Sequence, residues 1–207
     1  MYLPKLNQQP DQAKALAFMQ KYSFATLVSI IDNKPFATHM PLVVSEQAGK
    51  IKIEGHFAKN NPQWQNMAEQ EILVMFAEPH AYVSPSLYQD AQNVPTWNYI
   101  AVHAYGKAKV YGFEDNKKEL ENIIVATIKT FEEAYLEQYK ALTDKYKYGM
   151  MSAIVGFELE VTNLEAKDKL SQNKTPKDQE TVAHALAKSK DRVIAEVGEA
   201  MLEKFDS

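Results

Sequence analysis

Residues 79–106 read PHAYVSPSLYQDAQNVPTWNYIAVHAYG and contain four tyrosines, a tryptophan, two histidines and three prolines around a single charged residue, Asp90. The two ends of this stretch follow strand patterns, and the proline-flanked middle predicts a loop. We expect Ile100, Val102 and Ala104 to belong to the sheet interior, with the polar aromatic residues gathered at the loop end. Because aromatic residues most often serve packing, composition alone leaves the stretch between core and binding site.

Further strand patterns lie on both sides of this stretch. FATLVSII (24–31) and PFATHMPLVV (35–44) read as a hairpin around the turn DNK, and KIKIEGHF (50–57) and EILVMFA (71–77) as two more strands. SAIVGFELEVTNLE (152–165) alternates apolar and polar residues, which predicts a strand with one buried face. Because many short strands must hide their edges, we predict an α+β domain whose antiparallel sheet forms a barrel.

Helical patterns occupy three regions. Residues 9–22 predict a short amphipathic helix, and apolar residues three and four apart predict one long helix from Glu114 to Leu142. The tail from Thr175 predicts one or two helices behind Pro176, with residues 189–191 as the break. We therefore expect one domain over residues 1–174 and a helical extension over 175–207 packed on that domain.

Composition excludes several classes of protein. The chain has no cysteine, which rules out disulfides, thiolate catalysis and thiolate-bound metals. A net charge of −4 and a single arginine, Arg192, argue against an obvious DNA reader, because such domains usually carry a basic face. No apolar run reaches the roughly 20 residues of a membrane span, and the first residues lack a signal-peptide pattern, so we expect a cytoplasmic protein.

Side-chain spacing leaves the chemistry open. The histidines form no i, i+2 or i, i+4 pairs, so we expect no metal site, and no GxGxxG, Walker or GxSxG motif is present. Three turns carry groups that suit a phosphate: ATHMPL (37–42), GHFAKNNPQW (55–64) and AKDKLSQN (166–173). Each is equally readable as an ordinary capped turn, so both interpretations stay open at this point.

Several motifs together resemble one known family. MYLPK at the start, FATLV, ATHMPL, GHFAKNNPQW, PHAYVSPSLY, VPTWNYIAVHAYG, AIVGFELEV and KLSQNK are similar to the successive motifs of the PaiB family of FMN-binding negative transcriptional regulators. The resemblance runs from the first residue to about Lys174. It implies the FMN-binding split β-barrel fold, a homodimer with FMN between the subunits, and repression of sporulation and protease genes.

The resemblance also implies site residues, carried over motif by motif. The cofactor-binding residues that it implies are Thr38, His39, His56, Ala58, Lys59, Asn60, Asn61, Tyr82, Ser84, Trp97, Asn98, Lys169, Ser171 and Gln172. Tyr82 and Ser84 would flank the flavin ring, and Trp97 and Asn98 would come from the partner subunit. Two positions depart from the relatives: His39 stands where wider split-barrel proteins place a phosphate-gripping arginine, and Ala166 replaces a glycine of the family motif.

Three functions stay open on the sequence. The favoured one is an FMN-binding dimeric regulator without enzymatic activity. The first alternative is an FMN-dependent oxidoreductase that uses a reduced nicotinamide, and the second is a haem-binding split-barrel protein. No general acid or base with a partner is readable, so the sequence assigns no catalytic residue.

Overall fold

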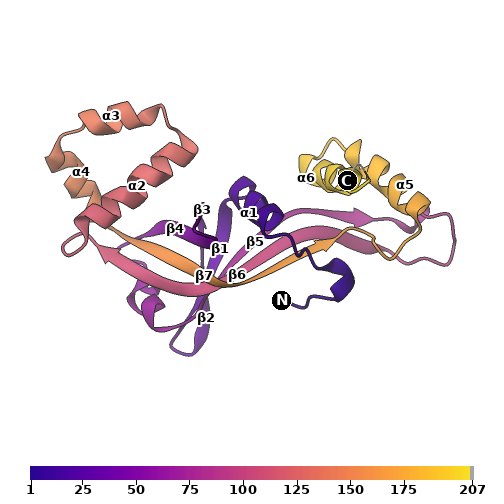
Figure 1. The fold of residues 1–207 in the computed structure, drawn as a ribbon, viewed down its shortest axis with the longest axis horizontal. Coiled ribbons are helices and arrows are strands. Elements are labelled where there is room, and N and C mark those ends of the chain that lie inside the picture. The colour runs from indigo at the N-terminus through magenta and orange to yellow at the C-terminus, as the bar shows by residue number, and fades with distance from the viewer. Residues whose placement is uncertain (206–207) are drawn as a thin grey trace. The chain divides into compact units, whose positions relative to one another are not determined.

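The computed structural model describes residues 1–205, which fold into a seven-stranded antiparallel sheet with six α-helices (Figure 1). The strands are β1 (Phe24–Ile31), β2 (Lys34–Pro41), β3 (Val43–Gln47), β4 (Lys50–Ala58), β5 (Ile72–Val83), β6 (Thr96–Gly112) and β7 (Ile154–Lys169). Their order in the sheet is β2-β1-β5-β6-β7-β4-β3. The predicted α+β class is confirmed, and the last two residues of the predicted C-terminal extension lie outside the described chain.

The strands follow the sequence patterns closely, with one division. β1 and β2 form the predicted hairpin, and Asp32 and Asn33 at its turn have φ angles of 50° and 60°, as a two-residue primed turn requires. The predicted strand over 35–44 is divided, because β2 ends at Pro41 and β3 starts at Val43 to pair with β4 instead. β6 is a single strand of 17 residues.

The helices are α1 (Gln12–Lys21), α2 (Lys117–Phe131), α3 (Tyr135–Ala141), α4 (Asp144–Met151), α5 (Pro176–Ala187) and α6 (Arg192–Leu202). The break predicted at residues 189–191 is confirmed: Asp191 caps α6 by accepting a hydrogen bond from the Val193 amide at 3.0 Å. Within residues 1–205, no helix has the length and apolar character needed to cross a membrane.

The prediction of one long helix over 114–142 is wrong. α2 ends at Phe131, Glu132 leaves the helical region with φ −157° and ψ 72°, and two shorter helices follow. The buried residues of α2, Leu120 and Ile123, lie in its first half, whereas Phe131 is half-exposed. The apolar spacing therefore continues in the sequence after the helix has lost its packing partner, and spacing alone does not hold a helix together.

The chain forms two compact units. The first unit comprises residues 1–15, residues 76–103 and the chain from Glu165 onward, so α5 and α6 belong to it. The second unit comprises residues 16–75 and 104–164. Because β5, β6 and β7 each contribute residues to both units, the division falls within these strands.

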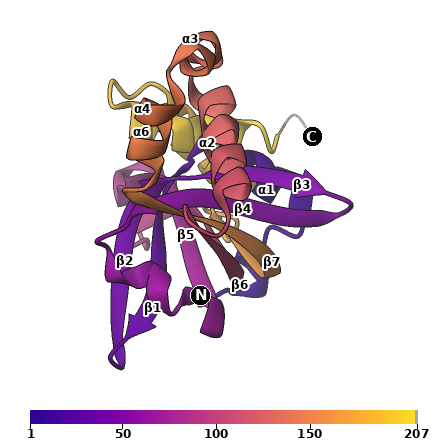
Figure 2. The ribbon, with the colours of Figure 1, turned by 90° about the vertical axis from the view of Figure 1, so that its left-hand side faces the viewer.

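The second unit has a core built on β1, β4 and β7. The rings of Phe57 and Phe157 pack 5.2 Å apart between centroids, and both side chains are buried. α2 packs against β4 in this unit (Figure 2). Gly156 permits the close approach of α2, since a Cβ atom there would lie 2.8 Å from Leu120 Cδ1 and 2.9 Å from Ile123 Cδ1.

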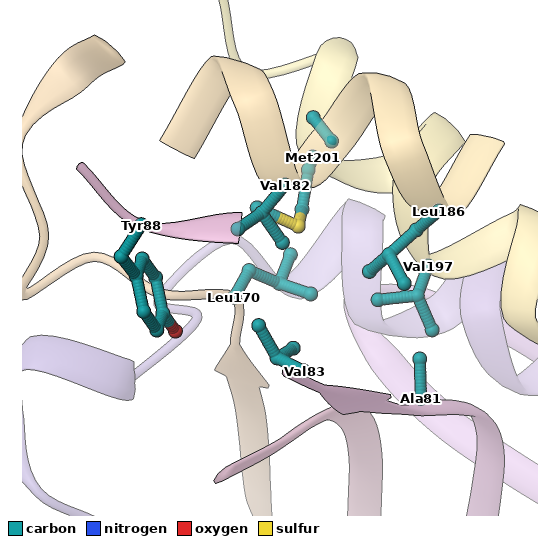
Figure 3. Close-up of a cluster of buried hydrophobic side chains, with 9 residues drawn as sticks. Ala81, Val83, Tyr88, Leu170, Val182, Leu186, Val197 and Met201 are labelled. Carbon is teal, nitrogen blue, oxygen red and sulfur yellow. The ribbon is translucent and has the colours of Figure 1, made fainter. Parts of the chain in front are cut away.

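The first unit has its own apolar core, which joins the strands to the two C-terminal helices. Ala81 and Val83 of β5 meet Val182 and Leu186 of α5 and Val197 and Met201 of α6. In Figure 3, Leu170 lies between Val83 and Val182, directly after the end of β7. This core covers the face of β5 and β6 that lies beneath α5 and α6. The opposite face of these strand ends is not covered by the two helices.

Candidate functional site

The strand ends of the first unit have two unlike faces, because successive side chains point to opposite sides of a sheet. Ala81 and Val83 point into the core beneath α5 and α6. Their neighbours His80 and Tyr82 are exposed. The same alternation in β6 places Asn98 in the interior and leaves Trp97 exposed.

The exposed side carries a group of aromatic rings. The Trp97 ring lies 5.9 Å from the Tyr82 ring in an edge-to-face arrangement and 6.0 Å from the His80 ring. Trp97 and Tyr82 are 53% and 50% exposed. We call the surface formed by His80, Tyr82, Trp97 and Lys169 the aromatic face. Large aromatic side chains left half-exposed side by side are typical of a ligand or subunit surface.

Lys169, at the end of β7, brings a positive charge to the aromatic face. Its Nζ donates to Thr96 Oγ1 at 2.6 Å and to the main-chain carbonyl of Trp97. Burial lowers the pKa of Lys169 from its ordinary value; Tyr99 acts in the opposite direction, and the positive charge of Lys167 lowers the pKa further. An ammonium group has three N–H donors, so one donor of Lys169 remains beyond these two bonds.

Lys167 and Tyr99 support this charged end of the site. Lys167 Nζ lies 5.1 Å from the centre of the Tyr99 ring and donates to the Tyr2 carbonyl at 3.0 Å. Lys167 is 6% exposed, so its charge is held inside the unit by a ring and a carbonyl. Neither residue is among those implied by the family resemblance.

The turn after Lys169 is held from within the first unit. Ser171 is buried with φ 63°, and its Oγ accepts a hydrogen bond from Asn98 Nδ2 at 2.9 Å. Gln172 Oε1 accepts from the Leu170 amide at 2.7 Å and from Asn7 Nδ2 at 3.2 Å. These bonds engage the side chains of Asn98, Ser171 and Gln172 in shaping the turn.

Ser84 also has a local role. Its Oγ lies 2.9 Å from Ser86 Oγ and accepts from the Ser86 amide at 3.3 Å, which caps the short 3-10 helix Pro85–Leu87. Tyr82, two residues earlier, is therefore the residue of this pair whose side chain lies on the aromatic face.

In the second unit, Thr38 and Asn61 belong to one hydrogen-bond network centred on Gln63. Asn61 Nδ2 donates to Thr38 Oγ1 at 2.9 Å, and Thr38 Oγ1 donates to Gln63 Oε1 at 2.6 Å. Gln63 is fully buried, and its Nε2 donates to the carbonyls of Leu27 and Phe36 at 3.2 and 3.1 Å. The network fixes the 3-10 helix Pro62–Gln65 against β1 and β2.

The other predicted residues of the second unit divide by exposure. Ala58 is the last residue of β4, Lys59 and Asn60 form the turn after it, and all three are exposed. The Lys59 carbonyl accepts a hydrogen bond from Trp64 Nε1 at 2.9 Å. His39 is exposed on β2, with Nδ1 2.8 Å from Thr26 Oγ1. His56 pairs with Gly156 on β7, and burial lowers the pKa of its imidazole below the ordinary value.

The fourteen residues implied by the resemblance thus form two groups, one in each unit. Within the first unit, Tyr82, Trp97 and Lys169 lie around the aromatic face, while Asn98, Ser171 and Gln172 hold the adjoining turn. Within the second unit, the side chains of Thr38 and Asn61 are bonded to each other.

Sequence reasoning missed four residues of these sites: His80, Tyr99, Lys167 and Gln63. Alternation was a usable signal for three of them, since His80, Tyr99 and Lys167 stand two residues from Tyr82, Trp97 and Lys169. No local pattern identifies Gln63, whose amide joins three separate segments of chain. Among the described residues, no group of three or more histidine, aspartate or glutamate side chains is arranged to hold a metal ion.

Comparisons with known proteins give a family. The family model described as "Putative FMN-binding domain" matches residues 1–163. The protein "Protease synthase and sporulation protein PAI 2" of Bacillus subtilis is 37% identical over 206 residues, which cover 99% of this chain and 98% of that protein. An uncharacterized protein of Emericella nidulans, AN0679, is 28% identical over an alignment of 177 residues, with a coverage of 67% for this chain and 67% for that protein.

Solved structures share the fold at low sequence identity. The flavocytochrome Anf3 of Azotobacter vinelandii superposes with a TM-score of 0.61 at 14% identity, over 77% of this chain and 68% of that one. An FAD and heme binding protein of Mycobacterium smegmatis gives 0.60 at 14% identity, over 84% and 78%. These likenesses confirm the fold as a split β-barrel, and the match over residues 1–163 together with the nearly full-length relative shows that the chain belongs to the PaiB family of FMN-binding proteins.

Proposed function

We propose that this protein holds FMN against the aromatic face and acts as a PaiB-type regulator, as a homodimer with FMN at the subunit interface. The observation that carries the proposal is the meeting of two half-exposed aromatic rings and a lysine ammonium on one side of the first unit. A flavin site needs flat apolar walls with a few polar groups at the rim, and a 5′-phosphate needs a cation.

The residues present fit FMN by their chemistry. Trp97 and Tyr82 supply ring surfaces for stacking, and Lys169 has one N–H left for a phosphate oxygen. Because burial already disfavours the charged state of Lys169, a dianionic phosphate beside it would restore that charge and gain a strong contact. When bound, FMN supplies the redox chemistry of its ring, and the protein tunes it through neighbouring groups.

The second unit has donor groups of its own in the turn after β4. Its Lys59 and Asn60 are exposed donors, whereas Thr38 and Asn61 are already bonded to each other. We propose that Thr38, Asn61 and Gln63 hold the turn formed by Lys59 and Asn60 in shape. His39 on β2 would add an imidazole donor in place of the arginine of wider relatives.

Exposed apolar residues support a dimer. Val94, three residues before Trp97 in the sequence, is 75% exposed, and Phe24 of the second unit is 69% exposed. Such side chains gain stability when a second subunit covers them, because burial of apolar surface contributes about 25 cal/mol per Å². Light scattering during gel filtration should therefore report twice the mass of one chain, 23.5 kDa.

The regulatory part of the proposal rests on the Bacillus subtilis relative, whose name refers to protease synthesis and sporulation. We propose repression of genes of this kind. A net charge of −4 and a single arginine do not favour direct contact with DNA, so regulation through a protein partner is consistent with the sequence. A gel-shift assay on the promoter fragment at low salt separates the two routes, since direct binding would weaken steeply as salt rises.

The experiment that tests FMN binding is the visible spectrum of the purified protein before and after it is mixed with FMN and passed through a gel-filtration column. An oxidised-flavin double band that travels with the protein supports the proposal. A colourless protein that leaves added FMN unchanged refutes it. Bleaching of bound flavin by NADH with turnover of an acceptor would point to the oxidoreductase instead, and a Soret band would point to haem.

A further inference from the structure

The turn that follows Lys169 is fixed from beneath by one buried amide. Asn98 of β6 is fully buried, and its Nδ2 donates to Ser171 Oγ at 2.9 Å and to Met201 Sδ of α6 at 3.5 Å. Ser171 Oγ also lies 3.2 Å from Asn98 Oδ1. A buried amide requires hydrogen-bond partners for its polar atoms. The Asn98 side chain therefore keeps its hydrogen bonds only while the turn and α6 stay in place.

Ser171 needs such a hold because its backbone is in the left-handed region, with φ 63°. A residue with a side chain rarely adopts this conformation unless its surroundings impose it. Leu170, between Lys169 and Ser171, is 2% exposed and packs into the first-unit core beneath α5 and α6 (Figure 3). The turn is thus held by an apolar anchor at Leu170 and a polar anchor at Ser171.

The start of β6 and the end of β7 are also joined by a second contact, on the aromatic face. Lys169 Nζ donates to the Trp97 carbonyl, and Trp97 directly precedes Asn98. The interior bond from Asn98 to Ser171 and the surface bond from Lys169 to the Trp97 carbonyl therefore fix the start of β6 and the end of β7 to each other from both faces. Loss of the interior bond would free the backbone that positions the ammonium.

We propose that Asn98 and Ser171 are positioning residues that set the place of the Lys169 ammonium for the phosphate of FMN, and that Met201 couples helix α6 to this arrangement. The proposal rests on FMN binding as proposed above. Under this proposal Asn98 acts from the interior of its own subunit. The C-terminal helices support the cofactor site indirectly, through Met201 and Asn98, and do not contact the cofactor.

The test compares the affinity of wild type and variants for FMN and for riboflavin, which lacks the phosphate. In Asn98→Ala we expect FMN affinity to fall by about tenfold or more, the scale of one well-placed bond to a charged group, while riboflavin affinity stays unchanged. The pH profile is the second readout: the alkaline midpoint for loss of FMN affinity should rise toward the ordinary lysine value, because Lys169 is no longer held in its buried position.

Two serine variants keep the proposal testable if Asn98→Ala does not fold. Ser171→Gly removes the hydroxyl but favours the positive φ, whereas Ser171→Ala removes the hydroxyl and keeps the strain, so Ser171→Ala should lose more FMN affinity. Ser29→Ala is the matched control, since Ser29 is an equally buried serine of the second unit whose hydroxyl has no hydrogen-bond partner among the described residues. It should bind FMN as wild type does.

The outcomes separate this inference from the proposed function. If wild type binds FMN and the Asn98 and Ser171 variants lose FMN and riboflavin affinity in equal proportion, or lose neither, the positioning role is overturned while FMN binding stands. If wild type binds no FMN, both the inference and the function beneath it are overturned. A selective loss of FMN affinity together with the shifted pH midpoint establishes the positioning role.

Discussion

The crossing of α5 and α6 allows a stability prediction of defined size. A Cβ atom at Gly198 of α6 would lie 2.2 Å from the Ala187 amide nitrogen and 2.6 Å from the Ala183 carbonyl oxygen. These are main-chain atoms, so no side-chain rotation relieves the overlap. For Gly198→Ala to restore an ordinary contact of 3.4 Å, α6 must move away by about 1.2 Å, the difference between 3.4 and 2.2 Å.

That movement opens the first-unit core. Val197 and Met201, the neighbours on α6, are 0% and 2% exposed and pack against α5 and β5. Loss of about half the burial of these two side chains costs about 1.5–3 kcal/mol, given roughly 1.5–3 kcal/mol for each complete burial. The alanine itself returns about 1 kcal/mol through helix propensity. We therefore expect Gly198→Ala to lower the free energy of unfolding by about 0.5–2 kcal/mol.

The assay is urea unfolding at fixed protein concentration, with Gly149→Ala as the control. Gly149 lies inside α4, and a Cβ atom there would meet nothing within 4 Å. This control should be stabilised by about 0.5–1 kcal/mol, because alanine is the better helix former. The reasoning is refuted if Gly198→Ala proves as stable as Gly149→Ala.

Three further predictions concern the site and its supports. Lys169→Met should weaken FMN binding by about 1.5–3 kcal/mol, or roughly 10- to 150-fold by titration, and Lys190→Met should not; equal affinities would remove Lys169 from the site. Gln63→Leu should lower the unfolding free energy by about 2–4 kcal/mol in urea, because the Leu27 and Phe36 carbonyls lose their buried donor; wild-type stability would contradict this. Since burial lowers the pKa of His56, stability should be full above about pH 6.5 and fall below it; His56→Gln should flatten this dependence.

Much of the fold was predictable because local patterns and tertiary packing agree there. Pro176 and Asp191 mark the starts of α5 and α6, and Asp32 and Asn33 mark the β1–β2 turn. The end of α2 at Phe131 was not predictable, because the helical spacing continues beyond it. That spacing gives no sign that Leu120 and Ile123 already supply the buried contact of α2. The end of a helix depends on where its packing partner ends.

The site was predictable in part through the family resemblance. It named Trp97 and Lys169, which lie together on the aromatic face, and Asn98, whose amide points to the interior. The interior role of Asn98 depends on Ser171 and Met201, which are 73 and 103 residues away in the sequence. Contacts of this kind follow from strand register and helix docking, and neither is set by local sequence.

The central claim, that FMN is held through its phosphate at the aromatic face, is tested most directly by titration of the wild-type protein with FMN and with riboflavin under the same conditions. The account predicts one FMN per chain, with riboflavin bound at least about tenfold more weakly because Lys169 loses its anionic partner. Equal affinity for the two flavins, or no binding of FMN, would contradict it.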